Sequence, residues 1–161
     1  VCNVDEKSAL TGNHYTNRVT GILEKENEQY LIVAARIESE IAELESFEER
    51  QIFLESMGLE ESGVSRLIKA AFKLLDLETY FTAGPMEVKA WTYLKGTKAP
   101  QAAGLIHSDF EHGFIRAEVI KFKDYMHYGS EAACREAGKM AVEGKNYVVQ
   151  DGDIMHFLFS R

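Results

Sequence analysis

The fold of the second half of the chain is decided by the stretch Thr79-Tyr80-Phe81-Thr82, the turn Ala83-Gly84-Pro85, and the segment Val88-Lys89-Ala90-Trp91-Thr92-Tyr93-Leu94. β-Branched and aromatic residues favour strands, whereas Gly and Pro favour turns. The sequence therefore predicts two strands joined by a short turn.

The residues that follow predict one helix and further strands. Pro100 suits the first turn of a helix that continues through Ile106, because its ring fixes a helical φ and its missing N–H is not needed there. A strand is expected over 114–121, a short helix between Ser130 and Gly138, and two late strands over 147–149 and 154–159. This order of elements is that of a β-grasp, an α+β fold.

The first half has helical spacing interrupted by one apolar run. Tyr30-Leu31-Ile32-Val33 predicts a strand buried on both faces of a parallel sheet. Asn13 is expected to cap the helix before it. A capping box, Ser46-x-x-Glu49, opens a later helix that Gly58 closes, and a last helix is expected over 63–75. Strand, helix, strand is the rhythm of an α/β domain.

Apolar residues recur at helical spacing in the first half, and we expect these stripes to be packed. They are Tyr15, Val19, Ile22 and Leu23, then Ile37, Ile41 and Leu44, then Val64, Leu67, Ile68, Ala71, Phe72 and Leu75. Among the nearby glutamates, Glu38 and Glu40 do not face one another, whereas Glu40 and Glu43 share a helix face. A solvated acidic surface explains Glu40 and Glu43, so the sequence predicts no catalytic or metal site there.

The segment Asn3-Val4-Asp5-Glu6 follows the short apolar stub Val1-Cys2, and it is typical of a base-recognition loop in a nucleotide-binding sheet. In the usual guanine-reading loop, Asn-Lys-x-Asp, the Asp carboxylate accepts two hydrogen bonds from guanine. Glu6 is one methylene longer, and Val4 stands where Lys would stack on the ring. Adenine presents an acceptor at this edge, so we expect relaxed guanine selectivity or adenine preference. The alternative is an ordinary turn at the end of a strand.

Two further features of the same region bear on this hypothesis. Ala34-Ala35 follows the predicted strand at its carboxyl end, where ligands of open α/β sheets bind, and small side chains there let backbone N–H groups approach a flat base. The stub Val1-Cys2 is shorter than a strand, so we expect the chain to begin within a domain.

Composition limits the function classes. A chain of 161 residues with 45% hydrophobic content can bury one good core or two small ones. It contains no run of about 18 apolar residues and no signal-peptide pattern, so no membrane partner is expected. Cys2 and Cys134 lack metal-type spacing, which predicts no disulfide partner, no zinc site and a reducing, cytoplasmic compartment.

The net charge of −8 is unevenly spread. Residues 1–77 hold 15 Asp and Glu against 8 Lys and Arg, whereas residues 78–161 hold 11 against 10. The basic residues of the second half fall among aromatic ones: Lys89, Lys95, Lys98, Arg116, Lys121 and Lys123 among Trp91, Tyr93, Phe110 and Phe114. Such a mix could meet an RNA backbone and stack on bases. The alternative is that these charges only solvate the outer face of a sheet.

Several long stretches carry a resemblance to a known family. They are Thr82–Pro85, Glu87–Thr92, Lys95–Gly104, Ile106–Phe110, Gly113–Val119 and Val149–Ile154. Together they resemble the terminal TGS domain of the YchF-type Obg-like ATPases, which are translation-factor-related P-loop proteins. The resemblance covers nearly every residue. It implies the C-terminal part of a P-loop NTPase parallel sheet with helices over 1–77, then a β-grasp (ubiquitin-like) TGS domain over 78–161.

The resemblance also implies a function. Members of the family bind and hydrolyse ATP in preference to GTP and associate with ribosomes, so Asn3, Val4, Glu6, Ala34 and Ala35 would line the base pocket. The phosphate loop, the switch segments and the Mg²⁺ ligands lie upstream in relatives. This chain is therefore expected to supply no catalytic residue and no metal ligand, and to be inactive alone.

Three basic residues, Lys95, Lys98 and Arg116, are candidates for a face that binds the ribosome or ribosomal RNA. His107 and Asp109 could contact RNA or pin a helix end to the sheet, and the second role is favoured. A monomer is expected. The alternative function is that of a non-catalytic β-grasp module that binds RNA or protein.

Overall fold

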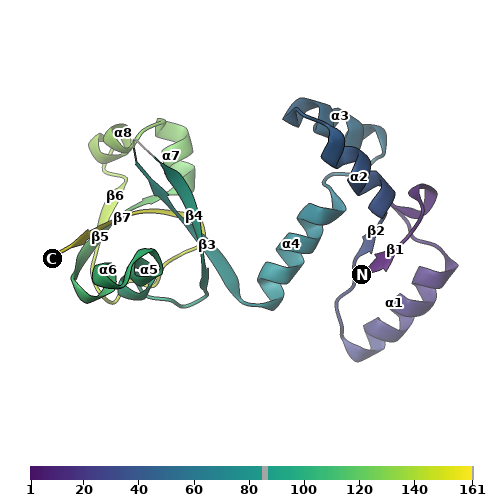
Figure 1. Cartoon of the computed structure of the whole chain (residues 1–161), viewed down its shortest axis with the longest axis horizontal. Helices are drawn as coiled ribbons and strands as arrows, with labels where there is room; N and C mark the ends of the chain where they lie inside the picture. Colours follow the sequence, from purple (N-terminus) through teal and green to yellow (C-terminus); the bar gives the residue numbers. More distant parts are fainter. Residues whose placement is uncertain (85–86, 161) are drawn as a thin grey trace. The chain divides into compact units, whose positions relative to one another are not determined.

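The structure of the chain is a computed structural model, and it describes residues 1–84 and 87–160. The chain divides into two compact units, the first formed by Val1–Ala71 and the second by the residues from Phe72 onward. The first unit is coloured purple to teal in Figure 1, and the second teal to yellow. Helix α4 (Gly63–Leu74) contains the boundary between them. A domain boundary after residue 77 remains a prediction.

The first unit contains a small parallel sheet. Strand β1 (Cys2–Asn3) pairs in parallel with β2 (Ile32–Val33), with Cys2 opposite Ile32 and Asn3 opposite Val33. The predicted parallel strand is thus present. It is shorter than the run 30–33, and its two residues are only half-buried. Within the described residues, β1 is the only strand that pairs with β2. The partial exposure of Ile32 and Val33 shows that the expectation of burial on both faces is wrong.

The helices of the first unit begin where their caps predict. Helix α1 (His14–Glu26) has a capping box between Asn13 and Thr16, and α3 (Phe47–Ser56) has one between Ser46 and Glu49. Between the strands and α3 lie η1 (Glu6–Ser8) and α2 (Ala35–Glu43). Gly58, after α3, has a φ of +69°, which a glycine adopts without strain. These local signals are sufficient to set the helix ends.

Packing of the predicted stripes differs between helices. Ile37 and Ile41 of α2 are buried and form a small core cluster with Ala9, Ala34 and Leu54. The stripes of α1 and α4 are largely exposed, with Tyr15 66%, Ile22 58% and Ile68 53% exposed. The prediction that these two stripes are packed is wrong in this structure. Helical periodicity identifies an apolar face, but it does not identify what covers that face.

The second unit is built on a mixed five-stranded sheet, in which β3 pairs in parallel with β7 and the remaining pairs are antiparallel. Its strands are β3 (Leu77–Ala83), β4 (Val88–Leu94), β5 (Phe114–Lys121), β6 (Met140–Glu143) and β7 (Asp153–Phe159). They lie in the order β4-β3-β7-β5-β6, so the last strand is inserted between the first and the third. The predicted hairpin is confirmed by the β3–β4 pairing. Pro85 of its predicted turn lies outside the described residues.

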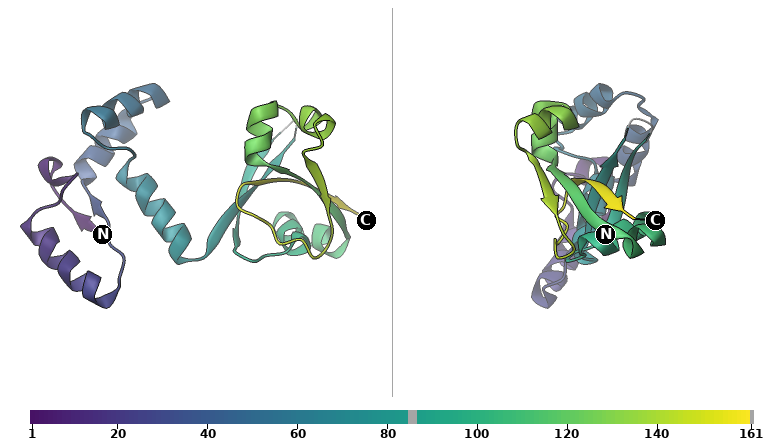
Figure 2. Two further views of the ribbon diagram at one scale, coloured as in Figure 1. Left: turned by 180° about the vertical axis from the view of Figure 1, so that it is seen from behind. Right: turned by 90° about the vertical axis from the view of Figure 1, so that its left-hand side faces the viewer.

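Short helices accompany this sheet. They are α5 (Ala99–Ile106), α6 (Ser108–His112), α7 (Phe122–Tyr128) and α8 (Glu131–Glu136). Figure 2 shows α5 and α6 gathered at one end of the unit and α7 and α8 at the other. Pro100 occupies the first turn of α5, and Ser130 caps α8, as predicted.

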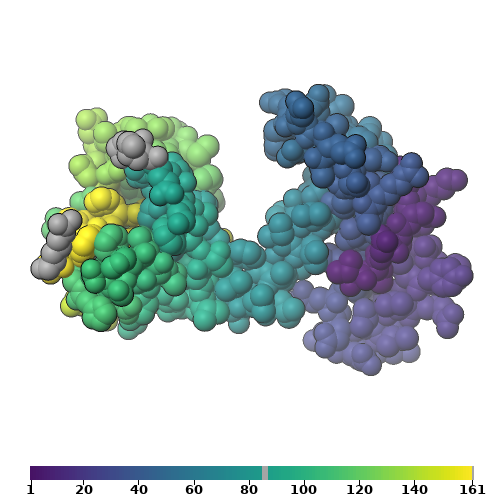
Figure 3. Space-filling view, in the orientation of Figure 1, coloured from purple at the N-terminus to yellow at the C-terminus, as the bar shows by residue number. Residues whose placement is uncertain are grey.

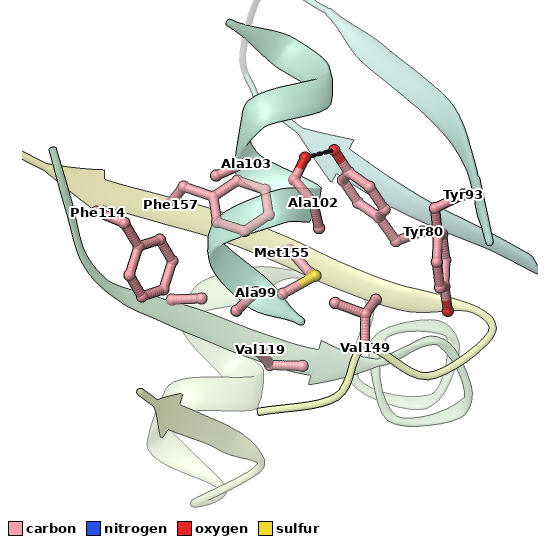
Figure 4. Close-up of a cluster of buried hydrophobic side chains, with 11 residues drawn as sticks. Tyr80, Tyr93, Ala99, Ala102, Ala103, Phe114, Val119, Val149, Met155 and Phe157 are labelled. Atoms are coloured by element: carbon pink, nitrogen blue, oxygen red, sulfur yellow. Dashed lines mark hydrogen bonds between the residues drawn. The ribbon is translucent and has the colours of Figure 1, made fainter. Parts of the chain in front are cut away.

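The core of the second unit lies between α5 and the sheet. Ala99, Ala102 and Ala103 of α5 are fully buried, which brings the helix backbone close to the strands. In Figure 4 the Tyr80 hydroxyl reaches this helix, where it donates to the Ala102 carbonyl at 2.8 Å. The Phe157 and Tyr80 rings are nearly perpendicular, with centroids 5.8 Å apart. The small side chains of α5 therefore make room for the large ones of the sheet.

Some predicted elements of the second unit are wrong. The late strand expected over 147–149 is not a sheet strand. Its backbone bonds instead to the segment before α5, through Ala99 N to Tyr147 O at 2.9 Å and Val149 N to Thr97 O at 3.0 Å. The remaining strand of the sheet is β6, from a segment not predicted as a strand. Helices α6 and α7 were also not predicted, because both are too short for periodicity to reveal them.

Within the described residues, none of the helices has both the length and the apolar character needed to cross a membrane.

Candidate functional site

The structure brings two of the predicted base loops together. Asn3 ends β1, and its Oδ1 accepts a hydrogen bond from the backbone N–H of Ala35 at 3.0 Å. Ala35 is the first residue of α2, directly after β2. The parallel pairing of β1 and β2 places the carboxyl ends of both strands at the same edge, so residues 32 positions apart in sequence meet there.

This hydrogen bond decides what Asn3 can offer a ligand. Its Oδ1 is engaged by Ala35, so the Nδ2 group, with two N–H donors, is left for another acceptor. Both purines carry such an acceptor at N7. A free amide N–H of this kind would not by itself distinguish adenine from guanine.

The two acids of the loop have different surroundings. Asp5 caps η1, where its carboxylate accepts from the N–H of Ser8 at 3.0 Å, and the hydrogen bonds from Ser8 hold the pKa of Asp5 below its ordinary value. Glu6 begins η1, and its side chain is exposed. Asp5 is thus engaged in local structure, and Glu6 is the acid that a base could meet.

Of the remaining predicted residues, Val4 and Ala34 pack against the core of the first unit, and Ala35 is exposed. Val4 is half-buried and packs against the core cluster, and its N–H donates to the carbonyl of Val33 at 2.9 Å. Ala34 is only 4% exposed, so its side chain faces the core, whereas Ala35 is exposed. Backbone groups of this loop and the small Ala35 methyl are the parts available to a ligand.

Two residues next to the loop were missed by the sequence reasoning. Glu38, on α2, accepts from the N–H groups of Gly63 and Val64 at 2.7 and 3.1 Å, and so caps α4 from a distance of 25 positions in sequence. Arg66, on α4, donates from Nη2 to the carbonyl of Ile32 at 2.9 Å. The sequence offers no signal for either contact, because each partner belongs to another element.

The neighbouring glutamates lie at the surface, as expected. Glu40 pairs with Arg36 one turn away, at 3.3 Å, and Glu43 is exposed. Within the described ranges, residues 1–84 and 87–160, no group of three or more His, Cys, Asp or Glu side chains is placed to hold a metal ion.

The three candidate ribosome-binding residues do not share one face. Lys98 immediately precedes α5 and is exposed, and Lys95 pairs with Glu78 at 3.3 Å. Arg116 is exposed on β5, next to the buried Ala117. Since neighbouring strand residues point to opposite faces, Arg116 lies on the side of the sheet away from α5.

The aromatic residues expected to stack on RNA bases are largely buried. Tyr93 and Phe114 belong to the core and are only 3% and 4% exposed, so the expectation that they stack on RNA bases is wrong. Trp91 is half-buried, its Nε1 donates to Thr82 Oγ1 at 3.0 Å, and the Lys89 ammonium lies 4.0 Å from its ring centroid. The alternation along β4 turns its aromatic side chains inward.

Lys121 is also engaged within the second unit. Its Nζ donates to the carboxylate of Asp153 at 2.6 Å and to the Tyr147 hydroxyl at 3.0 Å. Burial lowers the pKa of Lys121, but the hydrogen bonds to Asp153 and Tyr147 outweigh this effect and leave that pKa above its ordinary value. Burial and the hydrogen bond to Asp153 raise the pKa of Tyr147 to about 12. This lysine stabilises the fold.

His107 and Asp109 lie at the start of α6. The Nδ1 of His107 accepts from the N–H of Asp109 at 3.1 Å, so this histidine caps the helix. Both line an open pocket of about 740 Å³, with Phe110 and Phe159 stacked 3.9 Å apart. In Figure 3 the green atoms of α5 and α6 lie beside the yellow atoms of the last strand at this end of the unit. The cap is a structural role for His107, but it ties α6 to its own first turn rather than to the sheet.

Comparison with known protein families assigns the second unit. Residues 77–160 match the profile of YchF-GTPase_C, described as "Protein of unknown function (DUF933)". The chain belongs to this family. The match covers the whole mixed sheet from β3 to β7 and its helices.

Relatives of YchF-GTPase_C proteins extend the likeness over both units. The chain is 54% identical to "Ribosome-binding ATPase YchF" of Bacillus subtilis, over 99% of this chain and 44% of that protein. It is 46% identical to "Obg-like ATPase 1" of Homo sapiens, over 98% of this chain and 40% of that protein. The chain thus spans less than half the length of the curated relatives it matches.

Solved structures agree with this family assignment. The YchF GTPase of Schizosaccharomyces pombe superposes with a TM-score of 0.84 at 33% identity, over 97% of this chain and 42% of that one. A GTP binding protein from Pyrococcus horikoshii superposes with a TM-score of 0.63 at 17% identity, over 96% of this chain and 44% of that chain, and shares the fold.

Proposed function

We propose that this chain is the C-terminal part of a ribosome-associated P-loop protein that hydrolyses ATP in preference to GTP. In this proposal the first unit supplies the base-recognition loops, and the second is a TGS domain with the β-grasp fold. The observation that carries the nucleotide assignment is the hydrogen bond between Asn3 and Ala35, which joins the two loops at the carboxyl edge of a parallel sheet. Relatives named as ATPases and GTPases support it.

Base preference follows from the acid of the loop. Asn3 Nδ2 meets N7 of either purine, whereas Glu6 carries a longer carboxylate than the Asp of guanine-reading loops. A shorter acid held in place pairs with two N–H donors of guanine. The longer and exposed Glu6 does not enforce this pairing, so the loss of guanine selectivity permits adenine.

The catalytic machinery is proposed to lie outside this chain. ATP hydrolysis requires Mg²⁺ to bridge the phosphates and a group to orient the attacking water. This chain spans 44% of the Bacillus subtilis relative, which is named as an ATPase. We assign the Mg²⁺ ligands and the phosphate loop to the upstream part that the relatives carry, and we assign no catalytic role to a residue of this chain.

Ribosome binding is assigned to the second unit. Relatives are named for this activity, and a mixed sheet in the order β4-β3-β7-β5-β6 supports the β-grasp assignment. The proposed contacts are Lys95 and Lys98 near α5, or Arg116 on the opposite face of the sheet. Ribosome association supports a cytoplasmic location, and we propose that the protein is a monomer.

A direct experiment compares nucleotide affinities in the full-length protein, meaning this chain joined to the upstream residues that its relatives carry. Fluorescent ATP and GTP analogues give the two dissociation constants. ATP is expected to bind more tightly, and Glu6→Asp is expected to shift the ratio toward GTP by about 10-fold, equivalent to about 1.4 kcal/mol. An unchanged ratio in Glu6→Asp would show that this acid does not read the base.

A second candidate function is a β-grasp module that binds RNA or protein without nucleotide. It is favoured by the self-contained core of the second unit, which is centred on Tyr80 and Phe157. Binding of ribosomes by residues 77–160 alone, with no effect of nucleotide on the full-length protein, would support this candidate over the first.

A further inference from the structure

Helix α4 is attached to the helix that follows the base loop. The carboxylate of Glu38, three residues into α2 from Ala35, accepts from the first N–H groups of α4, those of Gly63 and Val64, at 2.7 and 3.1 Å. These N–H groups have no partner within their own helix, and the helix dipole favours an anion there. The contact is therefore a charge-assisted cap between two elements.

Helix α4 is also attached to the strand that precedes the base loop. Arg66 Nη2 donates to the carbonyl of Ile32 in β2 at 2.9 Å. Gly63 packs so closely on this strand that an added Cβ would lie 2.9 Å from a methyl of Val33 and 2.8 Å from Oε1 of Glu38. The helix start is thus fitted against β2 and Glu38 at once.

We propose that Glu38 and Arg66 are positioning residues that set the spacing of the two base loops. Ala34 and Ala35 lie between Val33 and Glu38, so α4 holds the loop on both sides. The other loop is joined to it through Asn3, and the pairing of β1 with β2 closes a ring of contacts. The identity of the ligand in this inference rests on the proposed ATP-binding function.

The ring matters because a purine slot tolerates little displacement. Asn3 reaches the base only while its Oδ1 stays on the N–H of Ala35, and that N–H begins the helix that carries Glu38. When the contact of Glu38 with the start of α4 or the contact of Arg66 with Ile32 is removed, α2 and β2 are free to shift relative to each other. A displacement of either loop would therefore weaken binding of the base without altering the groups that act on the phosphates.

The first experiment uses the full-length protein, with Glu38→Gln and Arg66→Met as test variants. Matched controls are Glu40→Gln on the same α2 and Lys69→Met on the same α4, since both side chains pair at the surface. The test variants are expected to raise KM for ATP about 10-fold with kcat at saturation unchanged, because they act on binding. The controls stay at wild-type values, and Arg66→Lys recovers most of the affinity.

The second experiment is independent of nucleotide and uses this 161-residue chain. Hydrogen exchange of the Ala35 amide is expected to be about 10-fold faster in Glu38→Gln and Arg66→Met, while amides of α3 keep their rates. Uniformly faster exchange throughout the first unit, or an unchanged rate at Ala35, would overturn the inference. If full-length wild type fails to bind ATP, the proposed function fails, and the exchange result still decides whether the ring positions this loop.

Discussion

Lys121 and Asp153 face each other across the β5–β7 pair, and the ammonium lies 2.6 Å from a carboxylate that is completely buried. Asp153 also accepts from the Tyr147 hydroxyl at 2.6 Å and from the N–H of Gln150 at 2.9 Å. One carboxylate therefore joins strand β5, the segment 147–150 and the start of β7. This explains how a segment outside the sheet is held in a fixed place.

Asp153→Ala is expected to destabilise the second unit by about 3 kcal/mol, because it removes a buried charged acceptor and leaves its donors unpaired. Trp91 is the sole tryptophan and lies in this unit, so its fluorescence reports denaturant unfolding there. Asp109→Ala, at a side chain that is 78% exposed, is the control. Equal stability of the two variants would contradict this role for Asp153.

Alkaline pH is expected to unfold the second unit. The pKa values of Lys121 and Tyr147 are raised in the folded state, the latter to about 12. Burial also raises the pKa values of Tyr80 and Tyr93, with a hydrogen bond to Glu78 adding to the effect at Tyr93. Between the unfolded value, about 10 for tyrosine, and the folded values, the native state binds more protons, so stability falls as pH rises.

The measurement for this pH dependence is a denaturant midpoint recorded from neutral to alkaline pH, with tyrosinate absorbance followed in parallel. Tyr147→Phe is expected to reduce the slope between about pH 10 and pH 12, because it removes one of the titrating groups. A slope that is the same in the variant and in the wild type would exclude Tyr147 as a contributor.

Gly63→Ala is expected to destabilise the first unit by about 1–3 kcal/mol, because the new methyl group would press on Val33 and Glu38. Gly21→Ala is the matched control. It lies inside α1 with open space at its Cβ position, and alanine there should stabilise by about 0.5–1 kcal/mol. Thermal unfolding followed by circular dichroism gives both values, and opposite signs are the expected result.

The separation of the basic residues predicts two distinguishable effects on ribosome binding. Lys95→Glu with Lys98→Glu alters the end of the sheet near α5, whereas Arg116→Glu alters the opposite face. The variant that alters the RNA-binding face should bind ribosomes less tightly. The slope of log K against log salt concentration should fall in magnitude by about one for each phosphate group that is no longer neutralised. Lys145→Glu makes the same charge change as Arg116→Glu at another exposed site. If all variants bind equally, neither face meets the RNA.

Local signals were sufficient for much of the fold. Asn13, Ser46 and Ser130 cap the helices they were predicted to cap, and β5 has the predicted ends. These features depend on residues within a few positions of each other, so sequence alone contains the information. Only the resemblance implied that Asn3 and the Ala34–Ala35 loop lie near each other, and the parallel pairing of β1 with β2 now gives the physical reason for their contact.

What escaped prediction depends on distant partners. In the sequence, Glu38 cannot be distinguished from a solvent-exposed helical glutamate, because its partner is the start of α4, 25 positions away. Residues 147–149 have the composition of a strand, but their backbone bonds to the segment before α5 instead of to the sheet. For α1 the prediction was of packing that is not observed. Its apolar face predicts a packing partner, but no described residues bury this face. Tertiary context, which spacing cannot supply, decides each of these cases.

The central place of β7 has a consequence for biosynthesis. This strand is made after the other four, yet it lies between β3 and β5 and pairs with both. Until residues 153–159 leave the translating machinery, β3 and β5 each present an unpaired edge, which is a template for misassociation. The second unit must therefore complete its sheet late, and a nascent chain that stops before Asp153 should aggregate rather than fold.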